Sequence, residues 1–234
     1  NVDALAEEGI MYTNVYCTAG VCAPSRTAFG TGMYQQSVGG QHMRCIDAGY
    51  LAVPDEEIKH VAELLRADGY YTFTEDKLDY QFSNMNPGSG PFTIWDTEYA
   101  GKDGNSPWSG NKEDKPFFGL INMLETHESR LFGKSPVDVV SPDDVILPSY
   151  YPDTEAVRSD VAKLYNCVNN MDTQVGKILQ QLEDDGLADD TIVIFTADNG
   201  DCLPRAKREV YDSGIHVPMI IRYPDKYMPE GAEP

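Results

Sequence analysis

The sequence predicts an α/β protein in which a mostly parallel β-sheet is sandwiched between helices. Its strand candidates are continuous apolar runs, such as residues 191–196 and 217–221, rather than alternating patterns. Such runs are typical of strands buried on both faces. The chain has 234 residues, 41% of them hydrophobic, which suffices for one sizeable core. We therefore expect one domain over residues 1–234, with irregular loop insertions near 84–115 and 133–153.

Four segments have the apolar periodicity of helices and end at residues that commonly terminate helices. These segments are residues 3–9, 22–32, 55–67 and 154–185. Pro24 suits the first turn of the second segment, and Gly32 closes it. Gly69 and Gly186 follow the third and fourth segments, where a residue that tolerates positive φ ends a helix.

The strand candidates lie between these helices, and polar clusters follow strand candidates at three places. The candidates are residues 10–16, 70–73, 117–123, 191–196 and 217–221. The clusters centre on Cys22, on His127, and on Asp198 with Asn199. Ligands in open α/β sheets bind outside the carboxyl ends of the strands. We therefore expect these three clusters to share one site.

The charge and hydropathy of the chain argue against two classes of partner. A formal net charge of −20 argues against nucleic acid, whose phosphates require clustered Lys and Arg. The sequence contains no apolar run long enough to span a bilayer, and it shows no signal peptide. The many carboxylates could bind a hard cation such as Ca²⁺, although acidity also serves solubility alone.

Asp198, Asn199 and Gly200 form a candidate metal site. A carboxylate and an amide oxygen at the end of a strand can present two hard ligands to Ca²⁺ or Mg²⁺. The glycine allows close approach of the backbone. The same tripeptide is also a common turn, so it indicates a metal only together with other motifs.

The segment Cys22-Ala23-Pro24-Ser25-Arg26, with Thr31-Gly32 after it, resembles the signature of the sulfatase family. This family is the formylglycine-dependent branch of the alkaline-phosphatase-like superfamily. Three further stretches resemble motifs of the family in the same order, at residues 1–6, 187–200 and 207–218. Four ordered motifs along nearly the whole chain are far more specific than any one of them.

The resemblance implies that Cys22 is the precursor of the nucleophile. A maturation enzyme would oxidise it to formylglycine, whose hydrate attacks sulfur and so divides one difficult step into two. Asp198 and Asn199 would bind Ca²⁺, or Mg²⁺, which polarises the sulfate oxygens. Arg26 would hold the formylglycine hydroxyl.

Three other residues match family positions in the sulfate pocket. Lys77 matches a lysine that binds sulfate oxygens, and His127 matches a histidine that donates on the leaving-group side. Lys207 matches a lysine that contacts the bridging oxygen. Assistance to the leaving oxygen typically contributes about 10²–10⁴ in rate. The implied activity is hydrolysis of a sulfate ester or sulfamate, on a sulfated carbohydrate substrate.

The chain departs from the family pattern near Lys77. The family usually has Gly-Lys-x-His, whereas here Asp76 replaces the glycine and Asp79 stands where the histidine would be. Either Asp79 acts as the base that collapses the sulfated intermediate, or another histidine such as His42 takes over, or this step is slower. His216 replaces an arginine that usually precedes Val-Pro in the family.

The resemblance also implies elements beyond the ends of this chain. An Asp-Asp pair that supplies metal oxygens should precede Asn1, and a smaller C-terminal subdomain should follow Pro234. We therefore expect a partial catalytic domain, whose parent protein is exported to the periplasm, secreted or lysosomal. Two alternatives stay open: a formylglycine phosphonate monoester or phosphodiester hydrolase, and a degenerate relative without catalysis.

Overall fold

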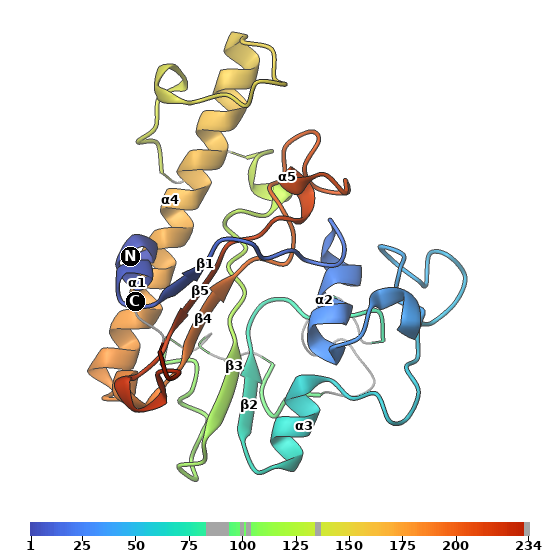
Figure 1. Ribbon diagram of the computed structural model, residues 1–234, viewed down its shortest axis with the longest axis vertical. Coiled ribbons are helices and arrows are strands. Elements are labelled where there is room, and N and C mark those ends of the chain that lie inside the picture. The colour runs from blue at the N-terminus through green and yellow to red at the C-terminus, as the bar shows by residue number, and fades with distance from the viewer. Residues whose placement is uncertain (83–93, 99–100, 102–103, 134–136, 232–234) are drawn as a thin grey trace.

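The computed structural model describes residues 1–82, 94–98, 101, 104–133 and 137–231. Two sheets lie between two groups of helices (Figure 1). One sheet has the order β1 (Ile10–Tyr12), β5 (Met219–Arg222), β4 (Val193–Thr196), and the other pairs β2 (Tyr71–Thr74) with β3 (Phe117–Leu120). Helices α1 (Val2–Glu7) and α4 (Glu155–Asp184) lie on one side, and α2 (Cys22–Thr31) and α3 (Val61–Ala67) on the other. The predicted α/β class is confirmed.

The strand pairing is mixed rather than mostly parallel. Strands β2 and β3 are parallel, whereas β5 runs antiparallel to both β1 and β4. Strand β5 returns to β4 after a connection whose one α-helix is the single-turn α5 (Asp212–Ile215). A parallel pair needs a crossover connection, and the long segment between β2 and β3 provides one. The apolar runs identified strands but not their direction. The expectation of burial on both faces holds for β2, all four residues of which are buried, but not for β4, which has no buried residue and whose Ile194 is 56% exposed.

Helix α4 agrees closely with the predicted segment 154–185. Thr154 caps its N-terminus, where the side chain accepts a hydrogen bond from the N–H of Val157. The first N–H groups of a helix have no acceptor within the helix. This hydrogen bond supplies an acceptor to one of them and so fixes where the helix begins. Of the apolar residues expected on one face, Val161, Leu164, Val175 and Leu182 are buried. Leu182 joins Tyr71 and Phe73 of β2 in one core cluster, so α4 packs against the two-stranded sheet.

Helix α3 begins at Val61, six residues later than the start predicted at residue 55. His60 and Glu63 form a capping box: His60 Nδ1 accepts from the Ala62 N–H at 3.1 Å, and Glu63 accepts from the His60 N–H at 2.9 Å. The box fixes the first turn. An apolar pattern cannot reveal such a boundary, because Ile58 continues the periodicity outside the helix.

The two predicted loop insertions are only partly described. Residues 83–93, 99–100, 102–103 and 134–136 lie outside the described residues. Within the rest, Thr97 forms a parallel bridge to Phe73 of β2. Ile94 and Trp95 join Leu78 and Tyr80 in a core cluster. This cluster lies directly behind the segment that contains Lys77. No helix in the described part of the chain is both long enough and apolar enough for a bilayer crossing.

His60 is expected to make the stability of the fold sensitive to acid. It is 2% exposed, and burial, followed by the nearby charge of Arg26, lowers the pKa of its imidazole to about 3. In the unfolded chain this pKa is near 6.5, so the unfolded state binds the proton first as the pH falls. Stability is therefore complete above about pH 6.5 and declines toward pH 3, by up to about 1.4 kcal/mol per pH unit.

The variant His60→Asn tests this expectation, because asparagine can still cap α3 but does not titrate. Urea unfolding of the wild type should lose about 2 kcal/mol more between pH 7 and pH 5 than unfolding of the variant does. The variant loses ring packing at both pH values, so only the difference between the two pH values is informative. Equal pH dependence in both proteins would contradict a buried, neutral His60.

Candidate active site

Cys22 lies at the first position of α2, at the end of the sheet where β4 also ends. Its side chain is 1% exposed. Val21 before it is extended, and Gly32 closes the helix at φ 66°. The Asn199 amide nitrogen lies 3.6 Å from Cys22 Sγ and donates to it. Residues far apart in the sequence thus meet at this position, as the sequence predicted for the Cys22 and Asp198 clusters.

Asp198 links this cysteine to the basic residues of the site. Its Oδ1 accepts a hydrogen bond from Asn199 at 2.6 Å. Its Oδ2 lies 3.8 Å from Arg26 Nη1 and 3.6 Å from Lys77 Nζ. Asp198 is therefore shared between two cations that come from α2 and from the segment after β2. The carboxylate is also placed to bind a cation, because its side chain keeps 30% exposure.

Arg26 fixes the Lys77 segment through its guanidinium. Its Nε donates to the Leu78 carbonyl at 2.8 Å and its Nη2 to the Lys77 carbonyl at 2.9 Å. The side chain is almost fully buried, with its guanidinium 5.4 Å from the centre of the Tyr80 ring. Arg26 thus holds the backbone around Lys77 in place, and it also adds a positive charge on the helix that begins at Cys22.

Asp79, the departure from the family pattern, is a buried member of an ion-pair chain. It adopts φ 56°, a backbone conformation that non-glycine residues rarely take. Its carboxylate lies 3.4 Å from Lys77 Nζ and 2.8 Å from Arg44 Nη1. Charges therefore alternate from Arg44 through Asp79, Lys77 and Asp198 to Arg26.

His127 and Lys207 contribute the other side of the site. The Ser129 N–H donates to His127 Nδ1 at 3.3 Å, so the neutral imidazole carries its proton on Nε2. Burial, followed by the charges of Lys207 and Lys77, lowers the pKa of His127. Lys207 Nζ lies 3.6 Å from the carboxylate of Glu128, the residue next to His127. Two hydrogen-bond donors are thus brought close to each other, within electrostatic reach of Lys77.

His42 is the predicted residue that the structure does not bring into this cluster. Its ring lies edge-on against Tyr50, with centroids 5.9 Å apart. Within the described ranges, no hydrogen bond or ion pair joins its imidazole to Asp79 or Lys77. Its backbone carbonyl instead accepts from Gln81. Of the two residues proposed to replace the family histidine, only Asp79 is in direct contact with Lys77.

The described residues offer a divalent cation only part of a coordination shell. Among them, no group of three or more His, Cys, Asp or Glu side chains could hold a metal ion. Asp198 and Asn199 supply a carboxylate and an amide oxygen, the hard ligands that Ca²⁺ prefers. Ca²⁺ takes six to eight oxygens, so most of its ligands would have to come from elsewhere.

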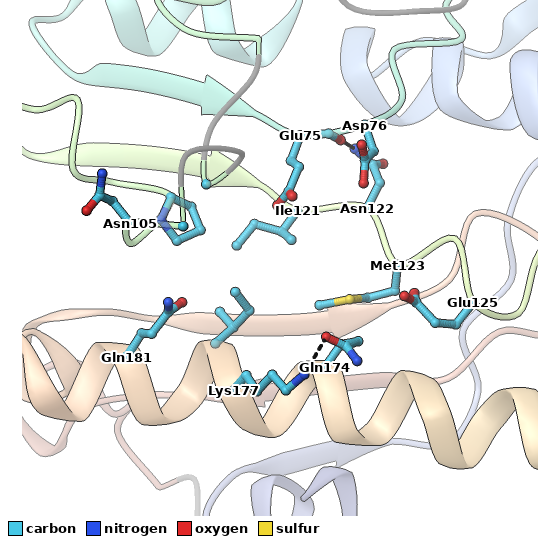
Figure 2. Close-up of a pocket in the computed structure, with 14 residues that line it drawn as sticks. Glu75, Asp76, Asn105, Ile121, Asn122, Met123, Glu125, Gln174, Lys177 and Gln181 are labelled. Carbon is cyan, nitrogen blue, oxygen red and sulfur yellow. Dashed lines mark hydrogen bonds between the residues drawn. The ribbon is translucent and has the colours of Figure 1, made fainter. Parts of the chain in front are cut away.

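A separate pocket lies between the ends of β2 and β3 and helix α4 (Figure 2). Figure 2 shows Glu75, Asp76 and Asn122 on the sheet side, opposite Gln174 and Lys177 on the helix. The lining of this pocket does not include Cys22 or Asp198. We therefore place the candidate chemistry at the cysteine and not in this pocket.

A model of the Sulfatase family matches residues 1–233. The chain belongs to the sulfatase family. An ulvan-active sulfatase of Formosa agariphila is 38% identical over all of this chain and 45% of its own length. The human N-sulphoglucosamine sulphohydrolase is 27% identical over 96% of this chain and 50% of its own length. The chain thus spans about half the length of these curated relatives.

Solved structures support the same fold. A Bacteroides thetaiotaomicron structure titled as part of glycosaminoglycan metabolism superposes with a TM-score of 0.69 over 96% of this chain and 60% of that protein, at 19% identity. The phosphonate monoester hydrolase of Agrobacterium radiobacter superposes with a TM-score of 0.63 over 95% of this chain and 62% of that protein, at 17% identity. These similarities establish the sulfatase-type α/β fold, which both kinds of hydrolase share.

Three charged residues of the site, Arg44, Glu128 and Arg208, were not predicted from the sequence. Arg44 pairs with Asp79, and Arg208 and Lys207 both pair with Glu128. Glu128 and Arg208 are each adjacent in sequence to a predicted site residue, which was the available signal. Arg44 could not be found in this way, because its partner Asp79 lies 35 positions away in the sequence.

Proposed function

We propose that the protein containing this chain hydrolyses sulfate esters or sulfamates on a sulfated carbohydrate. One observation carries the proposal: Cys22, in the Cys-Ala-Pro-Ser-Arg motif, lies beside Asn199, while Asp198 next to it pairs with Arg26 and Lys77. The cations Arg26 and Lys77 can attract the negatively charged oxygens of a sulfate ester, and the residue at position 22 beside them can attack its sulfur. The glycan substrates named for the relatives, ulvan and sulphoglucosamine, support a carbohydrate.

In this proposal a maturation enzyme would convert Cys22 to formylglycine. One hydroxyl of the hydrated aldehyde would attack sulfur as the bond from sulfur to the sugar oxygen breaks, and the other would expel sulfate as the aldehyde re-forms. Lys77 binds the sulfate oxygens, and Arg26 holds the hydroxyl at position 22 and neutralises charge beside it; fixed cations of this kind stabilise developing charge without reorganisation. The Asn199 amide orients the group at position 22. His127 Nε2–H and Lys207 donate to the bridging oxygen as the alkoxide leaves. Asp79 holds Lys77 in place.

We also propose that the protein binds a divalent cation, Ca²⁺ or alternatively Mg²⁺, with Asp198 and Asn199 as ligands. The cation would polarise the sulfate oxygens, and residues outside the described part would complete its shell. CaCl₂ should raise the Tm of the full-length protein, because a ligand that binds only the native state stabilises it. The rise should be absent in Asp198→Ala, and an equal rise in that variant would contradict the assignment.

The closest alternative is a formylglycine phosphonate monoester or phosphodiester hydrolase, which the fold similarity to such an enzyme favours. A second alternative is a non-catalytic relative, favoured by the incomplete metal shell. We also propose that the protein containing this chain is exported to the periplasm, secreted or lysosomal.

One assay separates these functions. The full-length protein, produced together with a formylglycine-generating enzyme, should release sulfate from 4-nitrophenyl sulfate and from ulvan oligosaccharides faster than it cleaves 4-nitrophenyl phenylphosphonate. The mass of the tryptic peptide that contains Cys22 should show an aldehyde in place of the thiol. Preferential cleavage of the phosphonate would support the first alternative. No hydrolysis of any substrate, with an unmodified thiol, would support the second.

A further inference from the structure

Among the cations of the site, Arg208 has the most exposed side chain, and no proposed step uses it. Its side chain is 59% exposed, compared with 9% for Arg26, 13% for Lys77, 27% for Arg44 and 4% for Lys207. The buried cations are engaged with Asp198, Asp79 or Glu128 inside the cluster. Arg208 is therefore the cation of the site that a bound molecule could reach most readily from solvent.

The guanidinium of Arg208 is held rigidly despite its exposure. Its Nη1 and Nη2 donate to the two carboxylate oxygens of Glu128, at 3.0 and 2.9 Å. Its backbone N–H donates to the Gly20 carbonyl at 2.6 Å, and its φ of 77° is rare for a residue with a side chain. The contacts with Glu128 and Gly20 thus accompany an unfavourable backbone conformation of Arg208. Such conformations are common at functional sites.

The guanidinium of Arg208 lies next to the two residues that we assign to the leaving group. Glu128, with which it pairs, directly follows His127, and the same carboxylate lies 3.6 Å from Lys207 Nζ. Cys22 is among the groups that raise the pKa of Arg208, after Glu128, which indicates that the two lie within electrostatic reach. A sugar whose sulfate reaches position 22 would extend past this residue.

We propose that Arg208, oriented by Glu128, binds a second anionic group on the sugar that carries the sulfate or on its neighbour. This inference rests on the proposed function. A guanidinium has five N–H donors, and the bidentate pair with Glu128 uses two of them. The remaining donors match the planar geometry of a carboxylate, or the oxygens of a second sulfate. Arg208 thereby selects acidic glycans in a protein whose net charge of −20 would otherwise repel them.

The test compares three sulfated disaccharides with the full-length, matured protein. One is neutral apart from the sulfate that is cleaved, one adds a uronic acid carboxylate, and one adds a second sulfate. In Arg208→Ala, KM for one of the acidic substrates should rise about tenfold to a hundredfold more than KM for the neutral one. The acidic substrate that is affected identifies the group. Arg208→Lys should recover part of the loss, because it keeps the charge without the planar fork.

Arg158→Ala is the matched control. Arg158 also forms a two-pronged pair with a carboxylate, that of Asp153, but on helix α4 and outside the site. It should leave the ratio of KM values unchanged. Equal rises for all three substrates in Arg208→Ala would overturn the inference and make Arg208 a structural clamp on Glu128. A wild-type protein that releases sulfate from none of the three substrates would instead overturn the proposed function.

Discussion

Cys22→Ala should lower kcat/KM for sulfate-ester hydrolysis by about 10⁴-fold or more, while the protein remains folded. Removal of a nucleophile costs this much because the remaining groups still bind the substrate but cannot form the covalent intermediate. The thiol is 1% exposed, so its loss leaves a small cavity that costs roughly 1 kcal/mol of stability. Steady-state kinetics on 4-nitrophenyl sulfate measure the effect, with circular dichroism as the test of folding.

Cys167→Ala is the matched control for this variant. Cys167 is 2% exposed, unpaired and located on α4, so its replacement leaves a similar cavity outside the site. It should keep nearly all of the activity. If Cys22→Ala also retained activity, the nucleophile would lie elsewhere, and the cluster around Asn199 would have to be a binding site rather than a catalytic one.

The parts of the site that could be predicted are those fixed by local structure. A helix that begins at Cys22 places Arg26 one turn further along the same helix, and a strand that ends at Thr196 places Asp198 at the sheet edge. These relations are contained within short segments. The long helix α4 was likewise predictable because its periodicity and its Thr154 cap agree.

The parts that could not be predicted depend on contacts between distant segments. The pairing of Arg44 with Asp79 joins two loops, and no periodicity or turn signal fixes where those loops run. The mixed pairing around β5 depends on how the chain returns after Asn199, which apolar content does not encode. His60 as a helix cap was hidden because histidine is not a preferred cap.

Gly200→Ala should disrupt the site more than its small change in size suggests. A Cβ at this position would lie 1.9 Å from the Ser213 carbonyl oxygen and 2.8 Å from Gly214 Cα. Both are backbone atoms, so no side-chain rotation can relieve the overlap. The Gly200 N–H also donates to the Gly214 carbonyl at 2.8 Å. The turn after β4 must therefore separate from the segment before β5.

Two losses should follow from that separation. Forced overpacking of this kind costs about 3 kcal/mol, which corresponds to a fall in Tm of roughly 6–12 °C for a chain of this size. Displacement of Asp198 and Asn199 by about 1 Å would lower kcat about 10²-fold. Differential scanning calorimetry and steady-state kinetics measure the two effects.

Gly133→Ala supplies the comparison, since a Cβ there would meet nothing within 4 Å. That variant should keep the wild-type Tm within about 2 °C, because surface changes of this kind alter stability by at most about 0.5 kcal/mol. Wild-type stability and activity in Gly200→Ala would mean that the two backbones are further apart in solution. In that case the close contact between the Asp198 turn and the segment after Lys207 could not be what aligns the two sides of the site.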